Sequence, residues 1–209
     1  MKTKRPILGG FTLIETLVAI SIIMIGLTAA FSVAQMGISS SSFAKDRITA
    51  FFLAQEALEA VRNMKDANLL EINTNPPGPN WLENMTRLGA SNGPCGVPVG
   101  SETPAECDYD LSTGLAGAGT DQFLSCSDVR ANNCNLKNST YGAGANRAKY
   151  YGYFGSSGGY AGGSNSKFTR KITINEIVPD VEARVTVTVT WGSASNQKFI
   201  VTDNISSWF

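Results

Sequence analysis

A long uninterrupted run of apolar residues near the start of the chain predicts a helix of membrane length. No charged side chain occurs from Thr16 to Ala34. A bilayer core about 30 Å thick is crossed by roughly 20 residues of helix, so this run alone can cross it. We expect a hydrophobic helix over residues 11–38, preceded by a short basic segment over residues 1–10.

The apolar pattern then changes to that of an amphipathic helix over residues 39–72. The stretch Gly37–Ser42 consists mostly of poor helix formers and predicts a flexible joint between two helical halves. Apolar side chains follow at three- and four-residue spacing, at Phe51, Ala54, Leu58 and Val61. This spacing predicts one apolar stripe, which would pack against a sheet.

Residues 167–209 carry the alternating pattern of β-strands. Apolar and polar side chains alternate strictly from Val181 to Trp191, which is typical of a half-buried antiparallel strand. Further strands are predicted for Phe168–Ile177 and Gln197–Asp203, each separated from the central one by a turn. A helix on one face of an antiparallel sheet predicts an α+β fold.

Between these patterns, residues 73–166 are rich in Gly, Asn, Ser and Pro and show no clear periodicity. Such a long irregular section is uncommon in a compact domain. All four cysteines of the chain lie in it, at Cys95, Cys107, Cys126 and Cys134. We therefore expect a long irregular insertion that interrupts the fold between the helix and the sheet.

The charges near the N-terminus set the expected compartment of these cysteines. Lys2, Lys4 and Arg5 place the N-terminal tail on the cytoplasmic side of a membrane, and one span then places the remainder outside. An oxidising exterior favours disulfides. Three pairings are open, and proximity in sequence favours Cys95–Cys107 and Cys126–Cys134. Because no Cys-x-x-Cys spacing and no histidine occur, we expect no structural zinc or other metal site.

Composition argues against catalysis and against nucleic acid as a partner. The net charge is +0, which gives no support to nucleic-acid binding. Residues 155–159 fit the Gly-x-Ser-x-Gly pattern, but without any histidine a serine nucleophile has no base. Glu106, Asp108 and Asp110 lack a complete calcium-loop pattern and are interpreted as a solvated acidic turn. We expect no catalytic residue and no cofactor.

A single carboxylate at the head of the apolar run requires an explanation. An ionised acid at the centre of a bilayer costs about 2.5–3.5 kcal/mol, and less near its edge. Glu15 lies near the end of the run, and a plain membrane anchor or secretory signal would gain nothing from it. We therefore expect Glu15 to have a specific partner.

The stretch Gly10-Phe11-Thr12-Leu13-Ile14-Glu15, with its basic leader and apolar helix, resembles the N-terminal signature of type IV prepilins. The resemblance implies cleavage between Gly10 and Phe11 by prepilin peptidase, and N-methylation of the new Phe11 amine. It also implies polymerisation with other pilin subunits, in which Glu15 pairs with the N-terminus of a neighbour. The membrane would hold the chain before assembly, and a cell-surface or periplasmic filament afterwards.

The C-terminal sequence Val189-Thr190-Trp191 is similar to that of minor pilins. Two alternatives remain open at this stage. A type II secretion pseudopilin would share every feature of the N-terminal half. A single-pass, membrane-anchored adhesion or binding protein that does not polymerise would retain its leader and would not need Glu15. One departure from many pilins is that the apolar run contains no proline.

Overall fold

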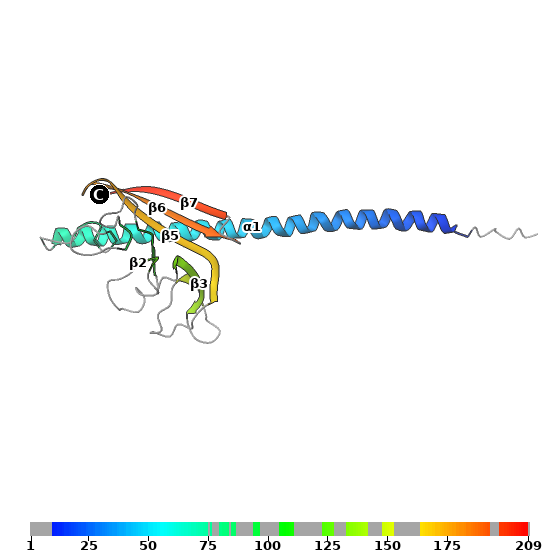
Figure 1. Ribbon diagram of the computed structural model, residues 1–209, viewed down its shortest axis with the longest axis horizontal. Coiled ribbons are helices and arrows are strands. Elements are labelled where there is room, and N and C mark those ends of the chain that lie inside the picture. Colours follow the sequence, from blue (N-terminus) through cyan, green and yellow to red (C-terminus); the bar gives the residue numbers. More distant parts are fainter. Residues whose placement is uncertain are drawn as a thin grey trace, which may run out of the picture. The chain divides into compact units, whose positions relative to one another are not determined.

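A computed structural model of the chain describes residues 10–74, 76, 80–83, 85–86, 94–96, 105–110, 123–127, 133–141, 148–152, 164–192 and 197–208. These residues form helix α1 (Leu13–Thr74) and strands β1 (Cys107–Tyr109), β2 (Phe123–Ser125), β3 (Asn135–Tyr141), β4 (Ala148–Gly152), β5 (Ser164–Val178), β6 (Glu182–Trp191) and β7 (Gln197–Ser206) (Figure 1). The predicted α+β class is confirmed. The chain divides into two compact units, residues 1–46 and residues 47–209, and the second is called the head here.

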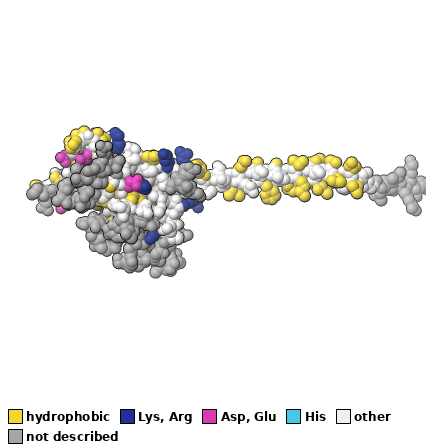
Figure 2. All heavy atoms as spheres, in the orientation of Figure 1, with side chains coloured by type: hydrophobic (Ala, Val, Ile, Leu, Met, Phe, Trp, Pro, Cys, Tyr) yellow, Lys and Arg dark blue, Asp and Glu magenta, His cyan; other side chains and the backbone are white. Residues whose placement is uncertain are grey.

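In the first unit, α1 is helical without interruption and presents its apolar side chains outward (Figure 2). The flexible joint predicted at Gly37–Ser42 is wrong, because α1 has no break there. Glycine and serine are less favourable than alanine in a helix by only about 1 kcal/mol or less per residue. Because extending an existing helix needs no new nucleus, the helix continues through them. Hydroxyl side chains elsewhere in this unit donate to backbone carbonyls of the preceding helical turn, as Ser21 does to the Leu17 carbonyl at 2.8 Å.

In the head, α1 contributes a buried face made largely of alanine. Ala50, Ala54 and Ala57 are fully buried, together with the larger Leu53 and Val61. The predicted stripe is therefore only partly right. Ala54 and Val61 are buried as predicted, but Leu58 is only partly buried and Phe51 is 41% exposed. Small side chains let a helix approach a sheet closely, and the bulky Phe51 lies at the border of the contact. Its ring meets that of Phe199 on β7, with 5.8 Å between centroids.

Strand β5 is the centre of a seven-stranded antiparallel sheet. One of its edges pairs with β6 along Phe168–Val178, and β6 pairs in turn with β7. Its other edge pairs with β3 near residues 164–169 and with β1 at Ile172. The alternation predicted for β6 is confirmed, and β5 and β7 extend beyond the predicted bounds. The buried face of β5 and β6 packs with α1 in one apolar core.

The section from residue 73 to 166 contains four strands that the sequence pattern did not reveal. Strands β1 and β2 have three residues each, which is too short to display a period of two. Strand β3 has the sequence Asn-Leu-Lys-Asn-Ser-Thr-Tyr, and among those of its side chains that the structure describes only Leu136 is buried. These strands are therefore defined by their pairing with β5 and with each other, not by their own pattern.

Two disulfides lie in this section and join Cys95 to Cys107 and Cys126 to Cys134. They are the pairings that proximity in sequence favoured. Cys95 and Cys107 are fully buried in the core. The Cys95 amide donates to the Met85 carbonyl at 2.8 Å, and Cys107 pairs with Ile172 of β5. This bridge therefore ties the segment before β1 directly to the central strand.

Candidate functional site

The N-terminal candidate site lies where α1 begins. Gly10 and Phe11 precede the helix, and Thr12 occupies its N-cap. The Glu15 amide donates to the Thr12 carbonyl at 3.1 Å and lies 3.4 Å from the Thr12 hydroxyl oxygen. A threonine cap followed three residues later by glutamate is the sequence pattern of a capping box. The side chain of Glu15 is thus in the first helical turn, where the helix dipole favours a carboxylate.

The Thr-x-x-Glu spacing therefore suggests a second, local role for Glu15 as a capping residue, which is a hypothesis because the two hydrogen bonds given above come from its backbone amide. At Gly10, no atom lies within 4 Å of the position that a Cβ would take. Packing around Gly10 in the described part of the chain therefore does not require glycine. Phe11 is 81% exposed and has no place in the apolar core. Both residues are accessible to another protein.

Residues 9–31 match the family model described as the prokaryotic N-terminal methylation motif. This motif is the type IV prepilin signature, and it indicates a structural protein. No curated protein and no solved structure matches the chain. In the described residues, α1 is long and apolar enough to cross a membrane. Motif and helix together support a single-pass, membrane-anchored protein with a pilin-like signature.

A second cluster of charged residues lies inside the head, around Arg170. Its side chain is 1% exposed and its Nε donates to Asp108 Oδ1 at 2.6 Å. The two terminal nitrogens donate to the Tyr109 carbonyl at 2.8 Å and to the Leu53 carbonyl at 3.3 Å. Glu56 on α1 lies 3.3 Å from the guanidinium. Arg170 therefore joins β5, β1 and α1, and its role is structural.

The interpretation of Glu106, Asp108 and Asp110 as a solvated acidic turn is wrong for two of the three. Asp108 is completely buried and Asp110 is 4% exposed. Only Glu106 lies at the surface, where it pairs with Lys171. Arg170 occupies an inward position of β5, which was the sequence signal for a buried acidic partner. The described residues contain no group of three side chains suited to hold a metal.

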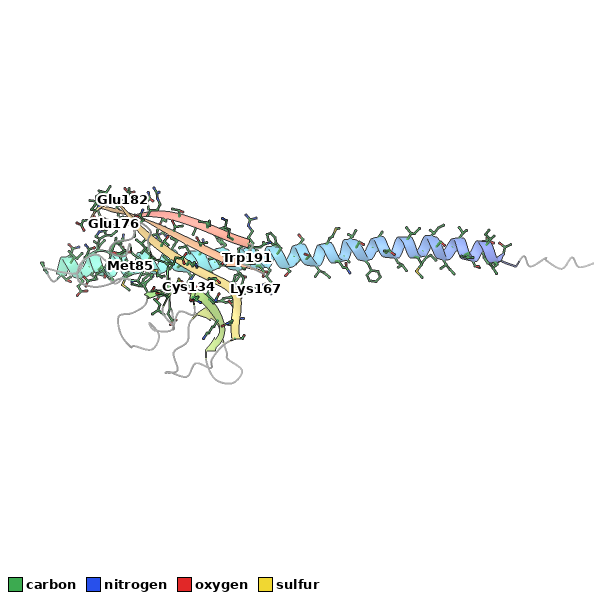
Figure 3. All side chains as sticks on the ribbon, viewed as in Figure 1. Met85, Cys134, Lys167, Glu176, Glu182 and Trp191 are labelled. Carbon is green, nitrogen blue, oxygen red and sulfur yellow. A yellow bond between two sulfur atoms is a disulfide. The ribbon has the colours of Figure 1, made fainter. Side chains whose placement is uncertain are left out.

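Glu176 is a partly buried carboxyl near the end of β5, at the same end of the β5–β6 pair as Glu182 (Figure 3). Among the described residues its Oε1 has no hydrogen-bond partner. Burial raises the pKa of Glu176, and the nearby carboxylate of Asp180 raises it further, while a backbone hydrogen bond from Asp180 opposes the change. Glu176 is therefore harder to ionise in the folded head than in the unfolded chain.

We expect Glu176→Gln to raise the melting temperature of the head at pH 7 and to leave it unchanged near pH 3. Because the pKa of Glu176 is raised in the folded head, this side chain contributes its full stabilisation at a pH below its unfolded pKa of about 4.3. That stabilisation is lost as the pH rises through the folded-state pKa. Glutamine removes that loss. Thermal unfolding at both pH values measures it, with Glu182→Gln as the control. An equal effect of Glu176→Gln at both pH values would contradict this origin.

Proposed function

We propose that the chain is a minor pilin-like structural subunit of a type IV pilus-type filament. It enters the membrane as a prepilin with its N-terminus cytoplasmic, is cleaved after Gly10 and is N-methylated at Phe11. The observation that supports this most strongly is the methylation motif at residues 9–31, in register with the start of α1. The partners are prepilin peptidase and other pilin subunits.

The local structure around Gly10 suits a protease. Residues 10–12 lie outside the helix, so their backbone can be extended in an active site. A glycine that packing does not require is consistent with recognition by another protein. Cleavage would leave Phe11 as the first residue, two positions before α1 begins at Leu13. The mature N-terminus would thus be an amine beside the helix start.

The new amine and Glu15 define the register of assembly. They are four residues apart, or about 6 Å along a helix. Among apolar helices, an unpaired charge costs several kcal/mol, so a subunit is favoured where its Phe11 amine meets a neighbour's Glu15 carboxylate. Subunits displaced along the axis would leave both charges unpaired. The pair therefore selects one axial offset among otherwise similar apolar contacts.

The apolar half of α1 would serve both stages. Its large side chains are more than half exposed, for example Leu17 at 58% and Ile25 at 72%. Lipid would cover them before assembly. In the filament the same side chains would contact the helices of neighbouring subunits, so the chain exchanges one apolar environment for another.

Three variants separate the assembly role of Glu15 from its capping role. We expect Glu15→Gln and Glu15→Ala to be processed normally but to lower incorporation into filaments at least about tenfold, since each leaves the amine unpaired. Glutamine can still close a capping box, so it removes the charge alone. Thr12→Ala removes the cap hydroxyl and keeps the charge, and we expect it to assemble.

The measurement is the ratio of the chain in sheared filaments to that in membranes, by immunoblot. If Glu15→Gln assembles like the wild type while Glu15→Ala and Thr12→Ala fail, Glu15 acts as a capping residue and the pairing proposal is wrong. Normal assembly of all three variants would also reject it.

A further inference from the structure

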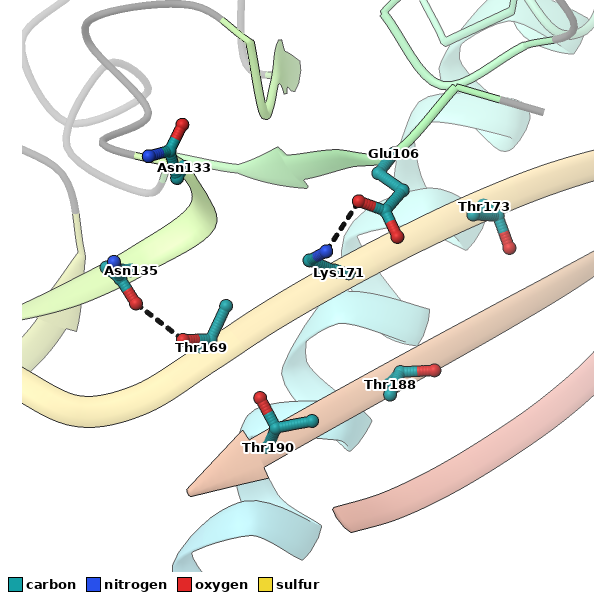
Figure 4. Close-up of a pocket in the computed structure, with 8 residues that line it drawn as sticks. All are labelled: Glu106, Asn133, Asn135, Thr169, Lys171, Thr173, Thr188 and Thr190. Carbon is teal, nitrogen blue, oxygen red and sulfur yellow. Dashed lines mark hydrogen bonds and ion pairs between the residues drawn. The ribbon is translucent and has the colours of Figure 1, made fainter. Parts of the chain in front are cut away.

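A polar groove of about 430 Å³ lies on the face of the sheet opposite α1 (Figure 4). Its floor consists of outward-facing side chains of β5 and β6, including Thr169, Thr188 and Thr190. Its wall is formed by Asn133 and Asn135, at the start of β3. Every described side chain that lines it is polar, and its volume is within the range of about 300–1,000 Å³ found for ligand sites.

The described residues that line the groove carry no net charge. Its two charged side chains, Glu106 and Lys171, form an ion pair with 2.5 Å between Lys171 Nζ and Glu106 Oε2. Glu106 is 50% exposed and Lys171 is 36% exposed, so water screens the electrostatic field of the pair. The described lining therefore offers a phosphate, a sulfate or a cation no unpaired opposite charge. The lining favours a neutral ligand.

Three of the lining side chains have hydrogen-bonding groups that the described part of the protein does not use. The Thr169 hydroxyl donates to Asn135 Oδ1 at 2.5 Å. In contrast, the side chains of Thr188, Thr190 and Asn133 have no hydrogen-bond partner among the described residues. Two hydroxyls and one amide offer donors and acceptors together. Thr188 and Thr190 are two positions apart on β6, so their hydroxyls lie on one face, about 7 Å apart along the strand.

The backbone at the wall is held in an uncommon conformation. Asn133 and Cys134 have φ values of 56° and 61°, in the left-handed region that few non-glycine residues adopt. Cys134 is fully buried and joined to Cys126. Asparagine tolerates this conformation better than most residues, so strain alone identifies no function. The disulfide nevertheless fixes the backbone that presents the Asn133 amide at the groove.

We propose that this groove binds a neutral polyhydroxylated ligand, the end of an oligosaccharide chain. Sugar hydroxyls both donate and accept, which matches the unused groups of Thr188, Thr190 and Asn133. Threonine methyl groups supply apolar contacts for the C–H faces of a sugar ring. The described lining contains no aromatic side chain on which a sugar ring could stack, so we expect a single groove to bind weakly. If the proposed function holds, many copies along a filament add avidity, but binding by one chain does not depend on it.

The test uses the full chain in phosphatidylcholine nanodiscs, because sugar-headed detergents would compete. Maltotetraose, cellotetraose, chitotetraose and mannotetraose are titrated by isothermal calorimetry. We expect at least one to bind with a Kd below about 10 mM, and Thr188→Val with Thr190→Val to weaken it about tenfold. Valine keeps the shape and β-branching of threonine. Thr202→Val is the matched control, because Thr202 of β7 lies on the same face of the sheet but outside the groove.

Two results would overturn the proposal. One is that none of the four tetraoses binds below about 10 mM. The other is binding that the double valine variant leaves unchanged. A sulfated oligosaccharide serves as the charge probe, and we expect it to bind no better than its neutral counterpart. Preference for the sulfated probe, weakened by salt, would show an anion site and contradict the neutral assignment. Filament assembly plays no part in these measurements.

Discussion

Asp108→Asn is expected to lower the free energy of unfolding of the head by about 3–5 kcal/mol, because it removes the charge of the fully buried carboxylate beside the Arg170 guanidinium and leaves the partly exposed Glu56 as its ion-pair partner. Asp108 is completely buried and accepts from Arg170 Nε at 2.6 Å. Asparagine has nearly the same shape, so the loss reflects charge and not a cavity. For a head of this size the melting temperature should fall by roughly 6–20 °C.

Thermal or denaturant unfolding of the chain measures this effect. Glu106→Gln is the matched control, since it removes an acid two residues away whose ion pair with Lys171 is exposed. We expect that control to change the stability by about 1 kcal/mol or less. Replacing Asp108 by leucine and Arg170 by methionine should recover part of the loss, because the buried guanidinium and its buried partner are removed together, while the partly exposed Glu56 loses its ion pair. A loss below about 1 kcal/mol for Asp108→Asn would show that the guanidinium is otherwise compensated.

Removing the Cys95–Cys107 bridge is expected to cost about 3 kcal/mol. The bridge closes a loop with a sequence separation of 12 and thereby restricts the unfolded chain. It also holds β1 at Ile172 of β5, so Asp108 and Tyr109 remain beside Arg170. We therefore expect a double Cys→Ala variant at these positions to combine with Asp108→Asn less than additively, since both changes act on β1.

The corresponding Cys126→Ala with Cys134→Ala variant is the comparison, with a sequence separation of 8. Loop entropy alone predicts nearly equal costs for the two bridges, which differ by about 0.3 kcal/mol. A larger cost for Cys95–Cys107, and coupling to Asp108 for that bridge alone, would confirm its role in holding β1. Full additivity with Asp108→Asn would contradict that role.

Local periodicity predicted the parts of the fold that depend on local pattern. The apolar run of α1 and the alternation of β6 each carry their own signal, so helix, sheet and class followed from the sequence. The buried face of α1 differs from the predicted stripe because alanine, although only weakly apolar, allows the closest contact between helix and sheet. Phe51 looked more apolar but lies at the border of the contact.

Features that depend on distant pairing could not be predicted in the same way. Strands β1 and β3 exist because β5 supplies hydrogen-bond partners from another part of the chain. The burial of Asp108 depends on Arg170, which is 62 positions away. The groove likewise combines β3, β5 and β6, and no single segment displays it. By contrast, the prepilin signature is contiguous, so the sequence alone indicated Gly10, Phe11 and Glu15.

The most direct test of the account is the N-terminus of the chain recovered from membranes and from sheared filaments. Intact mass and N-terminal sequencing distinguish the possible species without any variant. The account predicts that the filament fraction begins at an N-methylated Phe11, while uncleaved chain beginning at Met1 occurs only in membranes. A chain that keeps Met1 everywhere and never enters filaments, or one cut near Ala30, would contradict it.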